Sequence, residues 1–230
     1  MAVFAVIKYA GRCGSHWLRS CLNSHPDVFV LRNEQFDIDT DIWKCKEKWP
    51  RLIENVFDTF GSTGSHGCLV KANYVGNPLW YPLREEIARV PGIHIIQNSR
   101  HDYLAQYVSM ITASATGQFS SYLDPVQVDP LVVDTGKMLR AFANWDKKFK
   151  AHKKIYAGLP FYQLYYEDME NDLLGVMKQI YQFIGVDASH CPVFSTKKQR
   201  SRALRDAIDN YDVVVGAIQD SRWVDRLSDL

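Results

Sequence analysis

The residues whose types and spacing best suit ligand binding or catalysis lie in one loop, Gly11 to Trp17, which follows the apolar run 2–8. Its two glycines, Gly11 and Gly14, allow a tight turn and a close approach of backbone to ligand. A helix that starts near Gly14 would point its free N–H groups and its positive dipole end at that ligand. Arg12 adds a rigid fork of donors, and Ser15 adds a hydroxyl. The loop is either an anion cradle or a plain strand-to-helix turn with an exposed arginine.

Two kinds of phosphate chemistry can be compared with this loop. A nucleoside-triphosphate loop reads GxxxxGK[ST], and the absence of that Lys-Ser/Thr pair after Gly14 disfavours ATP or GTP hydrolysis. Cys13 and Arg19 fit the C-x5-R-[ST] loop of tyrosine phosphatases, where a thiolate attacks phosphorus and the arginine clamps the oxygens. Asp-Pro pairs at 124–125 and 129–130 could mimic the acid of such an enzyme. The bulky Trp17-Leu18 pair argues against this alternative, which stays open here.

The loop also resembles that of sulfotransferases that use 3′-phosphoadenosine 5′-phosphosulfate (PAPS) as donor. Their motif [RK]-[ST]-G-[ST]-x-x-L is matched by Arg12-Cys13-Gly14-Ser15-His16-Trp17-Leu18, although Cys13 replaces the usual Ser or Thr. The continuation RSCLNSHPDV is similar to bacterial and Golgi-type members. The resemblance implies a P-loop-like α/β fold in which residues 12–17 bind the phosphosulfate without an obligatory metal. It also implies that Arg12 stabilises charge during transfer.

Two later segments carry the same resemblance. After the run IHIIQN, members of the family have an Arg and a later Ser that bind the 3′-phosphate, which implies Arg100 and Ser109 here. The spacing is nine rather than the usual eight, so His101 is an alternative to Arg100. The run 164–169, LYYEDM, is similar to the family's Y-E-D-[LM], and it implies that Tyr166 contacts the nucleotide. We expect Glu167 and the next acid to cap the following helix and to pair with arginine.

A basic segment follows near the C-terminus. Residues 196–205, TKKQRSRALR, contain five basic side chains and no acid, which by themselves indicate a solvated surface. In the family a basic loop at this place folds over the bound nucleotide. The resemblance therefore implies that Lys198, Arg200 and Arg202 contact the nucleotide, with Arg200 and Arg202 at the 3′-phosphate.

Transfer to a hydroxyl also needs a base to take the acceptor proton. Cytosolic members use the histidine of a K-T-H segment, but the similar run 71–73 here ends in Asn73. Other branches use a glutamate shortly after the H-P-D turn, which implies Glu34 as the base. The expected reaction is in-line sulfuryl transfer to a hydroxyl or amine of a small-molecule, carbohydrate or lipid acceptor, with no covalent intermediate. A relative that binds the nucleotide without catalysis is a further alternative.

The elements that must position these residues follow from hydrophobic patterning. Apolar runs predict strands at 2–8, 28–31, 68–74, 93–98 and 161–166. Helical spacing predicts helices at 14–25, within 41–60, and at 82–90, 101–115, 133–152 and 170–184. We expect the five lysines of 147–154 to lie on an exposed helix face. Alternating strands and helices predict one parallel sheet flanked by helices, with ligands at the carboxyl ends of its strands.

Length and composition bound the remaining possibilities. The 230 residues suit a single sulfotransferase domain spanning 1–230, and a net charge of +1 gives no global attraction to nucleic acid. The five cysteines are scattered without a CxxC pair, so we expect no zinc site or other metal site and a reducing, cytoplasmic location. No run approaches about 20 apolar residues, so we expect no membrane span and no signal peptide.

Overall fold

The computed structural model describes residues 3–30, 65–71, 80–119, 122–197 and 203–227, with the backbone alone at 65–71 and 80–83. Its centre is a parallel sheet of five strands in the order β2-β3-β1-β4-β5. The strands are β1 (Val3–Lys8), β2 (Val28–Val30), β3 (Ser65–Lys71), β4 (His94–Ser99) and β5 (Phe161–Tyr165). The α/β fold predicted from the sequence, a parallel sheet flanked by helices in one domain, is confirmed.

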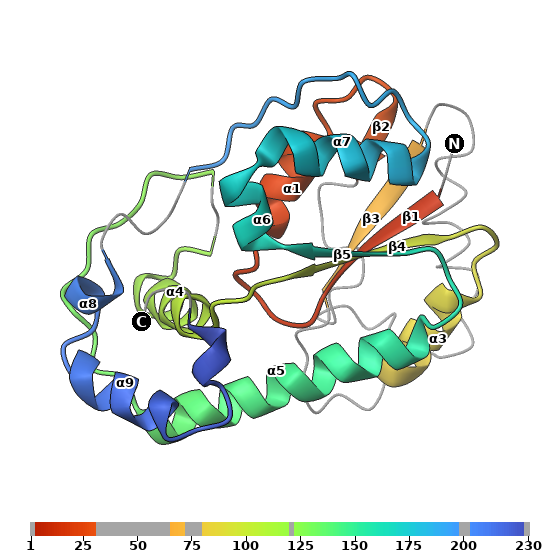
Figure 1. Ribbon diagram of the computed structural model, residues 1–230. Helices are drawn as coiled ribbons and strands as arrows, with labels where there is room; N and C mark the ends of the chain where they lie inside the picture. The colour runs from red at the N-terminus through yellow and green to blue at the C-terminus, as the bar shows by residue number, and fades with distance from the viewer. Residues whose placement is uncertain (1–2, 31–64, 72–79, 120–121, 198–202, 228–230) are drawn as a thin grey trace.

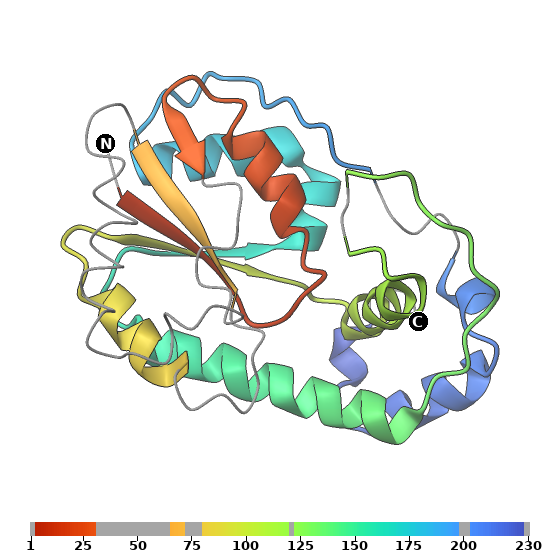
Figure 2. The ribbon, with the colours of Figure 1, turned by 180° about the vertical axis from the view of Figure 1, so that it is seen from behind.

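Helices cover both faces of the sheet (Figure 1). One face carries α1 (Ser15–Leu22), α6 (Tyr166–Asn171) and α7 (Leu173–Ile184), and the other carries α3 (Trp80–Ala88) and α5 (Thr135–Ile155). Beyond the carboxyl ends of β1 and β4 lie α4 (Tyr103–Thr116), α8 (Leu204–Ala207), α9 (Tyr211–Gln219) and the short η3 (Val224–Arg226). Figure 2 shows the same arrangement from behind.

The strand order creates a switch point beside β1. From β1 the chain passes through α1 to β2 on one side of the sheet, whereas β4 and β5 lie on the other side. The connections that leave β1 and β4 therefore diverge at neighbouring strand ends. In open parallel sheets this is where a ligand can enter, because the diverging connections do not cover the strand ends.

Two hydrophobic clusters hold the layers together. Phe4 and Val6 of β1 pack with α1 and α7, while Tyr9 and α4 pack with Phe142 and Trp145 of α5. Phe4 and Val6 share one face of β1 because strand side chains alternate, and Tyr9 follows directly after the strand. Each cluster thus fixes one of the two helices, α1 or α4, that flank the switch point.

Several sequence expectations change in detail. Helix α1 ends at Leu22 with Asn23 as its C-cap, and the Asn23 side chain joins this end to the backbone of Val30 in β2. The helix expected at 170–184 is split, since Asp172 caps α7. The lysine run of α5 was expected to be wholly exposed, but Lys148 is only 7% exposed because it lies on the face of α5 that packs inward. Its burial, with Arg84 nearby, lowers its pKa to about 8.

Candidate functional site

The loop between β1 and α1 has an unusual backbone. Arg12 adopts a left-handed conformation with φ 65°. Among the described residues other than glycine, Arg12 alone has a positive φ. Gly14 follows with φ 79° and ψ 15° at the N-cap of α1. Left-handed residues next to a helix start turn consecutive N–H groups toward one side, which is the geometry of an anion-binding nest. Strain of this kind in a non-glycine residue persists where surrounding structure enforces it.

Gly14 is needed for a close contact as well as for its backbone angle. The ring of Tyr166, at the start of α6, lies so close that a Cβ atom on residue 14 would come within 2.5 Å of its Cδ2 atom. The carboxyl end of β5 is thereby brought against the first turn of α1, two segments about 150 positions apart in the chain. The sequence placed Gly14 and Tyr166 in one site, and the structure brings them into contact.

Helix α4 holds the loop from its other side. The buried Gln106 donates from Nε2 to the carbonyl of Gly11 at 2.7 Å and accepts from the Tyr9 hydroxyl at 2.9 Å. Tyr9 is itself buried, and its hydroxyl also lies within 3.2 Å of the Arg100 carbonyl oxygen. Gln106 therefore joins both Tyr9 and Gly11 to α4, because its amide group acts as donor and acceptor together.

Arg12 reaches across the loop to α4 and the segment after it. Its Nε donates to the Ser109 hydroxyl at 3.0 Å, and its Nη1 donates to the Phe119 carbonyl at 2.7 Å. Burial lowers the pKa of Arg12, and the nearby charge of Arg100 lowers it further. Arg12 remains a cation, because the guanidinium group is not deprotonated in proteins. The two bonds fix the guanidinium plane, and they bring Ser109 beside Arg12.

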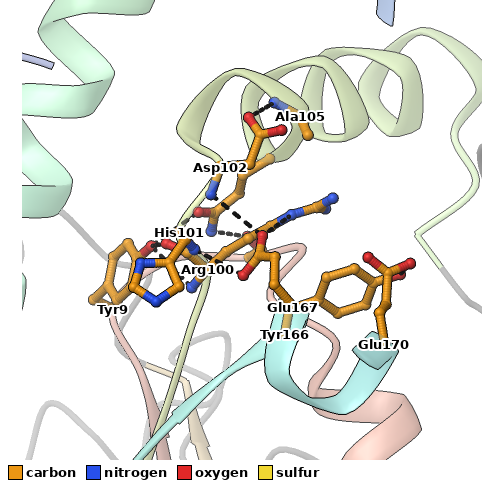
Figure 3. Close-up of polar contacts among 10 residues, drawn as sticks. Tyr9, Arg100, His101, Asp102, Ala105, Tyr166, Glu167 and Glu170 are labelled. Carbon is orange, nitrogen blue, oxygen red and sulfur yellow. Dashed lines mark hydrogen bonds and ion pairs between the residues drawn. The ribbon is translucent and has the colours of Figure 1, made fainter. Parts of the chain in front are cut away.

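Arg100 lies at the end of β4 and faces the same place from the other side. Its guanidinium carbon is 4.4 Å from the centroid of the Tyr166 ring, and its Nε binds Glu167 at 3.3 Å. Figure 3 shows the Glu167 carboxylate at the start of α4, where it also accepts from the N–H groups of His101 (2.9 Å) and Asp102 (3.2 Å). Glu167 pairs with arginine as expected, but its carboxylate binds the backbone just before α4, whose N-cap is Asp102. The next acid, Asp168, does cap the helix at this place, since it accepts from the Tyr165 N–H at the start of α6.

The side chain of His101 points away from the place that Arg100 faces. Its ring stacks on Tyr165 with the ring centroids 3.5 Å apart. The arginine, not the histidine, therefore lies over Tyr166 and near Arg12, which favours Arg100 over His101 as the partner of Arg12 in the site.

Two loop segments border α1 with aromatic side chains. Tyr122 stacks with His16 and its hydroxyl accepts from Arg19, while Phe194 meets Trp17 edge-on at 5.6 Å. The segment 191–197 is fixed along α1, because Ser24 and Ser20 accept from its backbone at residues 193 and 195. Lys197 joins the two segments through an ion pair with Asp124 at 2.5 Å.

The geometry around Cys13 disagrees with the phosphatase alternative. Cys13 is fully buried, and its thiol donates to the Ala10 carbonyl at 3.5 Å. Helix α1 begins at Ser15, so Gly14 alone separates Cys13 from the first helical residue. A reactive cysteine is at least partly exposed, and the phosphate loop of a tyrosine phosphatase needs its N–H groups open around the sulfur. Here Cys13 is buried and the residues from Ser15 onward are helical.

Several sequence-predicted residues lie outside the described residues: Glu34, Lys198, Arg200 and Arg202. Their roles stay predictions. In the part of the chain that the structure describes, no group of three or more His, Cys, Asp or Glu side chains could hold a metal ion. No helix within the same residues is long and apolar enough to cross a membrane.

Sequence reasoning missed three polar residues that border the loop: Lys8, Asn98 and Gln106, all buried. The alternation of the first strand offered one signal, because Lys8 shares a face with the apolar Phe4 and Val6. A lysine in that position is rarely buried without a reason. No sequence pattern marked Asn98 or Gln106, because their position beside the loop depends on how β4 and α4 pack against β1.

Comparison with solved structures shows the fold. A sulfotransferase from Alicyclobacillus acidocaldarius superposes with a TM-score of 0.54 at 14% identity, over 95% of this chain and 93% of that one. The fold is that of a sulfotransferase. Mouse sulfotransferase SULT7A1, complexed with PAP, superposes with a TM-score of 0.46 at 15% identity, over 96% of this chain and 85% of that one. No protein-family profile and no curated protein sequence matches the chain.

Proposed function

We propose that the protein is a sulfotransferase that moves the sulfuryl group of PAPS to a hydroxyl or amine of a small-molecule, glycan or lipid acceptor. The observation that carries the proposal is the pair of arginines at the switch point. Arg12 and Arg100 lie near enough for one charge to lower the pKa of the other, and both border the uncapped start of α1. Glu167 balances the charge of Arg100, but the two neighbouring cations still favour a further anion between them, and an adenosine with phosphate groups at both ends supplies it.

Each described residue has a role that follows from its position. The N–H groups of the first turn of α1 and the Ser15 hydroxyl would hold the phosphosulfate, and Arg12 would stabilise charge on the sulfuryl and bridging oxygens. Arg100 would bind the 3′-phosphate with its remaining N–H groups, and Ser109, which Arg12 holds in place, would add its hydroxyl. The rings of Trp17 and Tyr166 offer apolar faces for the adenine, and His16 and Cys13 complete the loop. Lys198, Arg200 and Arg202 would add contacts to the nucleotide.

The reaction needs no metal ion in this scheme. The acceptor oxygen or nitrogen attacks sulfur, the bond from sulfur to the 5′-phosphate oxygen breaks, and the electron pair leaves on that phosphate. The acceptor proton passes to a carboxylate, which we assign to Glu34. Arg12 would then be most strongly engaged when charge develops on the leaving oxygen, which is where an electrostatic contact accelerates transfer.

The test is calorimetric titration with 3′-phosphoadenosine 5′-phosphate, the product of transfer. We expect saturable binding by the intact protein, and a loss of about ten- to hundredfold in affinity for Arg12→Ala, because a charge-assisted hydrogen bond is removed. Arg89→Ala is the matched control, since Arg89 is an exposed arginine in the turn after α3. Absence of binding by folded wild-type protein would reject the proposal.

Catalysis is tested separately from binding. With labelled PAPS and a library of hydroxyl and amine acceptors, we expect transfer that Glu34→Gln abolishes while the affinity for the product nucleotide stays unchanged. Binding without transfer to any acceptor, together with no effect of Glu34→Gln, would identify the non-catalytic alternative instead.

A further inference from the structure

The carboxyl ends of β1 and β4 carry a buried polar pair that the roles above leave unused. Lys8, the last residue of β1, is 4% exposed, and Asn98 of β4 is 0% exposed. The two are register partners, so their side chains point to the same face of the sheet. Asn98 is in turn the partner of Leu164, which belongs to the hydrophobic cluster of α1 and α7. The pair therefore lies under α1, at the level of its first turn.

Lys8 makes a hydrogen bond that determines which way the Ser15 hydroxyl donates. Its Nζ donates to the Ser15 hydroxyl oxygen at 3.3 Å. An ammonium group has donors and no acceptor, so Ser15 must accept in this bond. The hydroxyl hydrogen of Ser15 is then left to donate elsewhere, and Ser15 is the first residue of α1, where the helix N–H groups are also outside the helical ladder. Lys8 therefore prepares Ser15 as a donor and places a positive charge behind it.

Asn98 is an independent sign that this place takes a ligand. Within the described residues neither its Nδ2 nor its Oδ1 has a hydrogen-bond partner, although the side chain is fully buried. Buried amides are almost always bonded in native proteins, and an exception calls for a missing water, ion or ligand group. The unpartnered amide lies beside a buried cation and a helix start, which both favour an anion, and its Nδ2 can add a donor to theirs.

We propose that Lys8 is a positioning residue for the 5′-phosphate end of the nucleotide, acting through Ser15, with Asn98 as the neighbouring donor. This inference rests on the proposed function and deepens it. It divides the anionic groups among three cations: Lys8 serves the 5′-phosphate, Arg12 the sulfuryl group and the bridging oxygen that stays on the product nucleotide, and Arg100 the 3′-phosphate. A lysine on the apolar face of β1 is then a part of the binding site and not of the core.

The experiment separates the two ends of the nucleotide. Wild type, Lys8→Met and the control Lys178→Met are titrated with 3′-phosphoadenosine 5′-phosphate, adenosine 5′-phosphate and adenosine 3′-phosphate. Lys8→Met is expected to lose about tenfold in affinity for the two ligands with a 5′-phosphate, and none for adenosine 3′-phosphate. Lys178 is an exposed lysine of α7, so its replacement changes net charge equally and should leave all three affinities unchanged.

A uniform loss for all three ligands, or no loss in Lys8→Met, would overturn the inference. Ser15→Ala should lose the same factor, and the double variant should lose no more than the larger single loss, whereas a sum of the two losses would overturn action through Ser15. Met has a similar length and no charge, so Lys8→Met should fold; if it does not, Ser15→Ala and Asn98→Leu carry the same ligand comparison. Failure of wild type to bind any ligand would reject the proposed function rather than this assignment.

Discussion

The contact between Gly14 and Tyr166 gives the sharpest prediction about stability. Gly14→Ala forces an alanine into φ 79° and brings its Cβ to 2.5 Å from the Tyr166 ring. A left-handed backbone costs an alanine about 1–2 kcal/mol, and overpacking a filled contact costs about 1–3 kcal/mol more. We therefore expect Gly14→Ala to lower the free energy of unfolding by roughly 2–5 kcal/mol, measured by urea denaturation.

Gly92→Ala separates the two contributions. Gly92 has a similar φ of 68°, but a Cβ there would meet nothing within 4 Å. Its substitution should cost only the backbone term of about 1–2 kcal/mol. In a Tyr166→Ala background the cost of Gly14→Ala should fall to that of Gly92→Ala. Equal costs for Gly14→Ala and Gly92→Ala, or an unchanged cost of Gly14→Ala without the ring, would refute the reasoning.

Three further predictions concern His152, Glu167 and Cys13. Burial, with Arg84 and Lys148, lowers the pKa of His152 below its usual 6.5, so stability is complete above pH 6.5 and is lost as pH falls, by up to about 1.4 kcal/mol per pH unit. His152→Gln should flatten the fall in melting temperature between pH 7 and 5; an unchanged slope would contradict this. Glu167→Ala leaves three donors without their acceptor and should cost about 1–3 kcal/mol in urea denaturation, against little for the exposed Glu85→Ala. Cys13→Ser should keep the nucleotide affinity within about twofold, since backbone N–H groups do most of the binding; loss of a measurable p-nitrophenyl phosphate hydrolysis would favour the phosphatase instead.

Local pattern was enough to predict most of the scaffold. Apolar runs marked the strands of the sheet, and helical spacing marked α1, α4, α5 and α7, because burial periodicity is a property of neighbouring residues. Boundaries were less accurate: Asn23 and Asp172 end or start helices through side-chain bonds that the apolar pattern does not contain. The burial of Lys148 was missed for the same reason, since a run of lysines looks exposed until the inward face of α5 is known.

The sequence by itself determined the chemistry-bearing segments of this protein: the glycine loop with Arg12, the Arg100 segment after β4, and the Tyr-Glu-Asp run after β5. Only the tertiary structure decided how they meet. Arg12 binds Ser109, Glu167 binds the backbone that leads into α4, and Lys8 lies beside Asn98 under Ser15. The physical reason is that composition and periodicity act over a few residues, whereas these contacts depend on the order and register of parallel strands. That order is set by the packing of both helical layers at once.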